Sequence, residues 1–192
     1  MRYLGFNVAQ ADIRTFGDQK ALVVERFDRQ QGEDGLIYRL TQEDMCQALG
    51  RAGQSKYEAN GGPGASEIAN LLRFSTDSEN DMYQFFLAQY VFWLLMGIDG
   101  HAKNFSVYLD HTGHWLTPLY DVISAHPFRN QFRRKELRMA MKVMSKNNHY
   151  KNFNNTKLPT SRIKNKVAKK LKYLSIRFLI ISPNIFSKRA NK

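Results

Sequence analysis

The segment GIDGHAKN, at positions 97–104, holds the side chains best suited to chemistry in this chain. Asp99 and Asn104 are separated by four residues, which is the D-x-x-x-x-N spacing of kinase catalytic loops. An aspartate beside a substrate hydroxyl can accept its proton during phosphoryl transfer, and an asparagine oxygen a few residues later can bind Mg²⁺. We therefore predict Asp99 as a catalytic base and Asn104 as a metal ligand.

A site of this kind needs a second carboxylate for the metal ion, and Asp121 is placed to supply it. It lies 22 residues after Asp99, in LTPLYDVIS, just past an apolar segment expected to be a strand. Mg²⁺ takes a few protein oxygens together with phosphate oxygens, which an Asn–Asp pair can provide. His101 and Lys103, on the same loop as Asp99, could then neutralise phosphate charge.

Each of these residues also has a plainer interpretation. Asp99 could cap a turn between two glycines, and Asp121 could be a turn residue after a strand. His101 could be a hydrogen-bonded structural histidine, and although it forms a D-x-H pattern with Asp99, no second His/Asp cluster supports a metal hydrolase. The glycine-rich loop at 61–64 lacks the G-x-x-x-x-G-K-[ST] pattern of phosphate-binding loops, which favours a tight structural turn.

Hydrophobic periodicity and turn residues predict three helices and two hairpins around these loops. Thr41 and Asp44 have the spacing of a capping box before the first helix, and apolar side chains cover most of the circumference of the third. The polar segment from Asp28 to Gly35 and the segment 56–64 are expected to be loops. The predicted helices cover 42–49, 65–74 and a segment from 81 to 97, and the predicted strands pair 11–16 with 20–27 and 104–109 with 115–120.

The basic charge of this chain is confined to its end. The 192 residues carry a net charge of +12, but residues 1–145 contain 16 Lys/Arg and 17 Asp/Glu, whereas residues 146–192 contain 13 Lys/Arg and no acid. We predict a domain over 1–145 and a basic tail over 146–192, irregular or frame-shifted. Binding of nucleic acid or a membrane surface through the tail is the less favoured interpretation of that charge.

Cysteine content and hydropathy predict a cytoplasmic location. The only cysteine, Cys46, excludes a disulfide framework and suits a reducing compartment. The sequence has no apolar run of about 18 residues and no secretory signal, so no membrane association is expected.

Five segments in this order and spacing resemble the C-terminal lobe of the HipA family, the serine/threonine-kinase toxins of bacterial toxin–antitoxin modules. The resemblance covers roughly residues 5–145. The segments are LVVERFDR at 22–29, LTQEDMCQALG at 40–50, KYEANGGPG at 56–64, GIDGHAKNFSVYL at 97–109 and LTPLYDVISAHP at 116–127.

The resemblance implies a role for each matching site residue. Asp99 would be the catalytic base, and Asn104 and Asp121 would hold Mg²⁺. The remaining residues would contact ATP: main-chain groups of the hinge would pair with adenine, and Asp28 would lie near the ribose. These nucleotide-binding residues are Glu25, Arg26, Phe27, Asp28, His101, Lys103, Asn104, Tyr120 and Asp121.

The fold class implied is α+β, mainly α: a kinase-like C-terminal lobe with a small hairpin and hinge remnant over residues 1–30 and no complete N-terminal lobe. The implied function is ATP- and Mg²⁺-dependent phosphorylation of a protein serine or threonine, weak or absent in this chain because a phosphate-binding loop and lysine are expected but not found. The alternative is a catalytically inactive module that binds an antitoxin. Expected partners are a HipB-like helix-turn-helix antitoxin, a protein substrate and a separate N-lobe chain, with DNA contacted only through the antitoxin.

Overall fold

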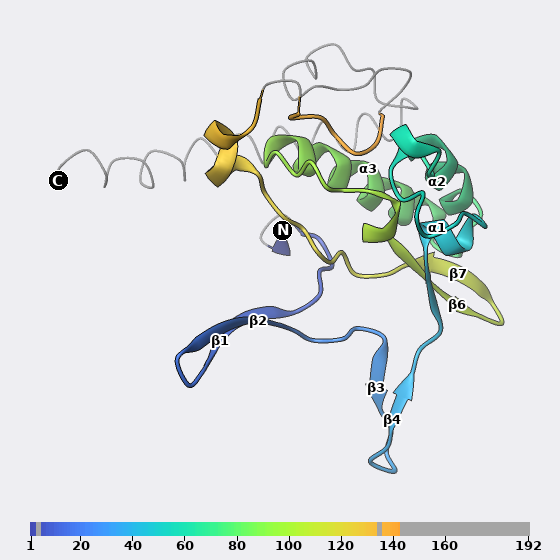
Figure 1. Ribbon diagram of the computed structural model, residues 1–192. Coiled ribbons are helices and arrows are strands. Elements are labelled where there is room, and N and C mark those ends of the chain that lie inside the picture. The colour runs from blue at the N-terminus through green and yellow to red at the C-terminus, as the bar shows by residue number, and fades with distance from the viewer. Residues whose placement is uncertain (3–4, 134–135, 143–192) are drawn as a thin grey trace. The chain divides into compact units, whose positions relative to one another are not determined.

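The computed structural model describes residues 1–2, 5–133 and 136–142. The predicted domain boundary near residue 145 and the tail lie outside these residues. The first element is an antiparallel hairpin of β1 (Ala11–Phe16) and β2 (Gln19–Val24), shown in blue in Figure 1. Gly17 has a φ of 63° in its turn, a conformation that glycine adopts without steric cost. The first predicted hairpin is therefore confirmed, although β2 ends before the expected Phe27.

A second hairpin forms where a loop was predicted. Strands β3 (Arg29–Gln31) and β4 (Ile37–Arg39) pair in antiparallel register. Asp34 fixes their turn, because its carboxylate accepts hydrogen bonds from the Leu36 N–H at 3.0 Å and the Tyr38 hydroxyl at 2.5 Å. Each strand has only three residues, too few to show an alternation of apolar and polar residues from which a hairpin could be predicted.

The third sheet has the strand order β5-β6-β7, formed by β5 (Gln42–Asp44), β6 (Ser106–Asp110) and β7 (Gly113–Leu116). The β6–β7 pair confirms the second predicted hairpin, with its second strand ending at Leu116 instead of Tyr120. Strand β5 was not predicted. It pairs with β6, so residues 42–44 lie beside the strand that follows the loop at residues 97–104.

The first helix begins later than predicted. Helix α1 (Met45–Ala48) is capped by Asp44, whose carboxylate accepts from the N–H groups of Cys46 and Gln47, while the Gln47 side chain accepts from the Asp44 N–H. The predicted capping box of Thr41 and Asp44 is therefore wrong. Residues 42–44 are extended because they pair with β6, and tertiary pairing overrides the local helix signal.

Two longer helices form the apolar core. Helix α2 (Ala65–Leu72) packs on α3 (Ser78–Leu94), which in turn contacts β7. The long helix is confirmed as central, although it begins at Ser78 instead of Asp81. Each fully buried Phe or Leu contributes about 1.5–3 kcal/mol. The buried apolar side chains of these helices include Ile68, Leu72, Phe85, Leu87, Val91 and Phe92.

Three short 3₁₀ helices complete the described chain: η2 (Glu58–Asn60), η3 (Ala102–Asn104) and η4 (His126–Gln131). The glycine-rich loop after η2 packs closely on the preceding segment, because a Cβ at Gly62 would collide with the Ser55 carbonyl. This close packing agrees with the structural turn considered for these glycines. Strands occupy about as much of the described chain as α-helices do, so the fold is mixed and a predominance of helix is not shown. Within the described residues, no helix is long and apolar enough to span a bilayer.

Candidate active site

The loop at residues 97–104, which holds the predicted base, leaves the end of α3 through a tight reversal held against Phe92. The Gly97 N–H donates to the Phe92 carbonyl at 2.6 Å, and Met96 has a φ of 53°, a left-handed conformation that non-glycine residues rarely adopt. A Cβ at Gly100 would lie 2.5 Å from the Phe92 ring. The glycines on either side of Asp99 therefore let the loop approach a fully buried aromatic side chain.

The Asp99 side chain lies partly in solvent and is held by a tyrosine from η2's N-terminal flank. The Tyr57 hydroxyl donates to Asp99 Oδ1 at 2.5 Å, while 47% of the Asp99 side chain stays exposed. This hydrogen bond, with burial adding to it, raises the pKa of Tyr57 to about 12. The phenol is therefore protonated at neutral pH and can only donate to the carboxylate.

The two predicted metal ligands lie in direct contact. Asn104 Nδ2 donates to Asp121 Oδ2 at 2.8 Å, and Asn104 Oδ1 accepts from the His101 N–H at 3.0 Å. Asn104 is buried, at 2% exposure, whereas Asp121 is exposed. Asp121 has a φ of 53°, and a strained non-glycine backbone of this kind is often found at functional sites.

His101 interacts electrostatically with both carboxylates. Its imidazole is buried, with Nε2 3.8 Å from Asp99 Oδ1 and its ring in an edge-to-face contact with Tyr57 at 5.0 Å. Burial lowers the pKa of His101, and the negative charges of Asp99 and Asp121 oppose that effect in part. Both carboxylates are thus near one imidazole. The neutralisation of phosphate charge by His101 stays a prediction.

Lys103 and Tyr120 are joined to the loop by polar contacts. The Lys103 ammonium lies 3.1 Å from Asp44, the residue that caps α1, so its charge is already paired. The Tyr120 hydroxyl lies 2.6 Å from Ser106 Oγ and donates to the Lys103 carbonyl at 2.7 Å. Burial raises the pKa of Tyr120 to about 12, which keeps it a neutral donor.

The predicted hinge, residues 25–28, contacts the site through Phe27. The Phe27 ring centroid lies 5.5 Å from that of Tyr120, and the Phe27 carbonyl accepts from the Tyr108 hydroxyl at 2.9 Å. The Glu25 N–H donates to the Gln10 carbonyl at 2.8 Å. Among the described residues, no hydrogen bond uses the Glu25 carbonyl or the Phe27 N–H.

Asp28 is committed to an ion pair and is not free in this structure. It is 2% exposed, and its carboxylate accepts from Arg26 Nε at 2.8 Å, from a terminal nitrogen of Arg26 at 2.6 Å and from Arg29 at 2.6 Å. The hydrogen bond from Arg26, reinforced by Arg29, lowers the pKa of Asp28 to about 2 despite its burial. Asp28, Arg26 and Arg29 thus brace the segment that contains the predicted hinge, and the place of Asp28 beside a ribose stays a prediction.

The residue that sequence reasoning missed is Tyr57. It lies 42 positions before Asp99, and a tyrosine in a loop gives no local sign of a partner so far along the chain. The sequence indicates only a helix-capping role for Asp44, whereas in the structure its carboxylate also pairs with the Lys103 ammonium. The Tyr57–Asp99 and Asp44–Lys103 contacts form because the segments at α1 and η2 lie against the loop at residues 97–104.

The fold resembles that of a solved HipA chain. In a structure of the toxin–antitoxin system HipA, HipB and its operator DNA from Shewanella oneidensis MR-1, the match covers 74% of this chain and 35% of that chain, with a TM-score of 0.62 and 33% identity. Residues 1–175 match the family described as HipA-like C-terminal domain. The chain belongs to that family.

Two curated relatives agree with this assignment. The serine/threonine-protein kinase toxin HipA of Shewanella oneidensis is 37% identical over 146 residues, which are 67% of this chain and 33% of the relative. "Putative kinase Y4mE" of Sinorhizobium fredii is 36% identical over 142 residues, 73% of this chain and 34% of the relative. The chain thus spans about a third of the length of the relatives it matches.

Proposed function

We propose that this chain is the catalytic lobe of a toxin kinase that transfers the γ-phosphoryl group of ATP to a serine or threonine of a protein. The observation that carries the proposal is the grouping of Asp99 with the Asn104–Asp121 pair around His101. A base and two metal-binding oxygens within one small region are what phosphoryl transfer requires. Membership of the HipA-like family supports the same chemistry.

The donor set fits Mg²⁺ better than a zinc-type metal. Asp121 is exposed and its Oδ2 accepts from the Asn104 amide nitrogen, while Asn104 Oδ1 accepts from the His101 N–H. The side-chain oxygens that these two residues could offer a cation are one carboxylate and one amide oxygen, and Mg²⁺ prefers oxygen ligands. Within the described residues there is no group of three or more His, Cys, Asp or Glu side chains suited to a metal. Asn104 and Asp121 would hold Mg²⁺ with phosphate oxygens, and the ion would neutralise phosphate charge.

The reaction step assigned to this chain is proton removal by Asp99. The hydroxyl of the acceptor gives its proton to the carboxylate as its oxygen forms a bond to the γ-phosphorus. The bond from that phosphorus to the bridging oxygen breaks, and ADP leaves with the electron pair. The exposed half of the Asp99 side chain is available for this transfer.

ATP would bind along the hinge. The Glu25 carbonyl and the Phe27 N–H, which make no internal hydrogen bond in the described chain, are an acceptor and a donor that adenine can meet. Their partner groups, the Glu25 N–H and the Phe27 carbonyl, are held by Gln10 and Tyr108, which fixes the segment. Phe27 and Tyr120 would form the apolar wall of the site.

The β1–β2 hairpin suits the packing of further strands from an N-terminal lobe. Paired residues share one face, and the pairs Ile13–Leu22 and Ala11–Val24 give that face an apolar stripe. Ile13 is 70% exposed and Leu22 is 68% exposed. A two-stranded hairpin is at best marginally stable in water, so an exposed apolar face of this kind favours a covering partner. We infer that an N-lobe segment, in the same or a separate chain, covers it.

A HipB-like helix-turn-helix antitoxin is the partner we propose, with DNA contacted through it. The support is the similar Shewanella structure, which contains HipA with HipB and operator DNA. The second candidate function is an inactive module that binds this antitoxin without turnover. One observation favours it: the Lys103 ammonium is already paired with Asp44, and burial lowers the pKa of His101.

Thermal unfolding with and without nucleotide tests the proposal. We expect Mg²⁺ and ATP together to raise the Tm of the full chain, and the shift to vanish in Asp121→Ala. Asp110→Ala, which removes an exposed aspartate from the β6–β7 turn, is the matched control and should keep the shift. Binding together with transfer of labelled phosphate to serine peptides supports the kinase. Binding without transfer supports the inactive module. No binding at millimolar ATP overturns the kinase and also supports the inactive module, which needs no nucleotide to bind an antitoxin.

A further inference from the structure

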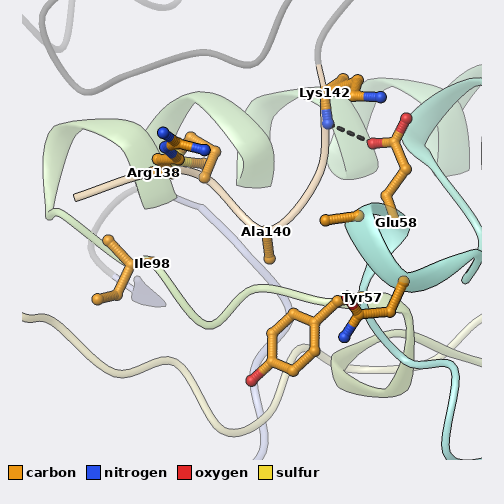
Figure 2. Close-up of a pocket in the computed structure, with 9 residues that line it drawn as sticks. Tyr57, Glu58, Ile98, Arg138, Ala140 and Lys142 are labelled. Atoms are coloured by element: carbon orange, nitrogen blue, oxygen red, sulfur yellow. Dashed lines mark hydrogen bonds between the residues drawn. The ribbon is translucent and has the colours of Figure 1, made fainter. Parts of the chain in front are cut away.

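A cavity of about 240 Å³ lies beside the catalytic loop, apart from the residues proposed to bind ATP. Figure 2 shows its wall, where Tyr57 and Ile98 lie on one side and the segment with Arg138 and Ala140 on another. The Lys142 N–H donates to Glu58 across one end of it. Ile98 directly precedes Asp99, so the cavity begins at the catalytic residue's own neighbour.

The size and lining of the cavity suit a short piece of peptide chain. Pockets that bury a whole small molecule are typically about 300–1,000 Å³, larger than this one. Ile98, Met139 and Ala140 offer apolar contacts, while Glu58 and Arg138 offer polar ones. Such a mixture favours a side chain with its flanking backbone over a nucleotide.

Tyr57 connects this cavity to the catalytic base. Its ring lines the cavity while its hydroxyl holds Asp99 Oδ1. Two contacts fix that ring: the edge-to-face packing with His101 at 5.0 Å, and the Lys56 ammonium 5.1 Å from the ring centroid. Among the described residues, no hydrogen bond uses Asp99 Oδ2.

We propose that the cavity receives the hydroxyl-bearing segment of the acceptor protein and that Tyr57 is a positioning residue, holding one oxygen of Asp99 so that the other faces the acceptor hydroxyl. This inference rests on the proposed kinase function. A carboxylate held by one oxygen cannot rotate freely, and proton transfer depends on such alignment. The acceptor proton passes to Asp99 Oδ2, and Tyr57 keeps its own proton throughout.

The positioning role is tested by phosphorylation of a degenerate peptide library with a central serine, using the full chain with Mg²⁺ and ATP. Tyr57→Phe should lower kcat on the order of tenfold, a fraction of the 10²–10⁴-fold that a general base contributes, with the KM for ATP unchanged. Tyr38→Phe is the matched control, because it removes a tyrosine–aspartate hydrogen bond of the same 2.5 Å length from the β3–β4 hairpin. It should leave kcat and both KM values unchanged.

A double variant separates positioning from simple loss of stability. In an Asp99→Asn background, Tyr57→Phe should cause no further loss, because Tyr57 acts through that carboxylate. An additive loss, or a Tyr57→Phe variant that behaves like Tyr38→Phe, would overturn the positioning role. Ala140→Leu narrows the cavity and should raise the KM for peptide severalfold without affecting the KM for ATP. An unchanged peptide KM would overturn the acceptor assignment.

The proposed function and this inference fail in different ways. A wild-type chain that transfers no phosphate to any peptide overturns the kinase function, and the inference with it. A wild-type chain that transfers phosphate but is indifferent to Tyr57→Phe and Ala140→Leu overturns only the inference.

Discussion

Replacing Asp28 with asparagine should test whether one buried carboxylate braces the hinge. Asp28 is 2% exposed and accepts three side-chain hydrogen bonds from Arg26 and Arg29, which flank Phe27 on the same segment. The variant keeps the shape of the side chain but removes its charge. Two arginine side chains would then converge on a neutral amide.

The magnitude follows from the pKa of Asp28, which is about 2 in the folded protein against an ordinary 3.8. Each unit is worth 1.36 kcal/mol, so the full shift corresponds to about 2 kcal/mol of stability at neutral pH. The Arg26 side chain is 62% exposed, and solvent screens part of the attraction. We therefore expect Asp28→Asn to reduce the free energy of unfolding by about 1–2 kcal/mol at pH 7.

The stability difference between the wild type and Asp28→Asn should also depend on pH. Because the folded-state pKa of Asp28 is depressed, its stabilising contribution is present above pH 3.8 and is lost as the pH falls towards 2. Urea unfolding followed by circular dichroism should show the wild type and Asp28→Asn separated at pH 7 and converging below pH 3.8. Equal stabilities at pH 7 would refute the bracing role. A gap that persists undiminished near pH 2 would show that packing, not charge, is lost.

Two further substitutions test contacts of helix α3. Gly100→Ala should destabilise the protein by about 1–3 kcal/mol in thermal unfolding, because its Cβ would lie 2.5 Å from the buried Phe92 ring. Gly53→Ala is its control, with an ordinary 3.5 Å contact to Lys103, and a loss as large there would contradict the steric explanation. Asp81 is buried, its pKa is raised by burial, and its carboxylate accepts from the Leu116 N–H at 2.9 Å. Since the folded state binds that proton more tightly, its contribution falls as the pH rises above 3.8, and at pH 7 Asp81→Asn should be more stable than Asp81→Ala by about 1–3 kcal/mol.

The elements that were predicted well have strong local signals. The β1–β2 hairpin has β-branched strands around Gly17, and helix α3 has an apolar circumference that only burial can satisfy. Strand β5 and the β3–β4 hairpin were not predicted, because strands of three residues are too short to show a hydrophobic periodicity. They become strands only when partners far along the chain or across a turn supply hydrogen bonds.

In the candidate site, too, some features follow from local sequence signals and others from tertiary contacts. Asp99, Asn104 and Asp121 could be selected from residue type and spacing, and the tertiary structure brings Asn104 and Asp121 into contact. Their assigned roles as base and metal ligands stay predictions. The charge state of His101 and the pairing of Lys103 with Asp44 could not be predicted, because burial and α1 decide them.

The sequence by itself determined the family and the residues whose side chains are suited to chemistry, since short motifs fix residue types at fixed separations. Tertiary structure alone decided which of those groups are charged, paired or exposed. Tyr57 reaches Asp99 across 42 positions, and Asp28 lies buried between two arginines. Hydrogen bonding and desolvation depend on distances in space, and a linear spacing does not contain those distances.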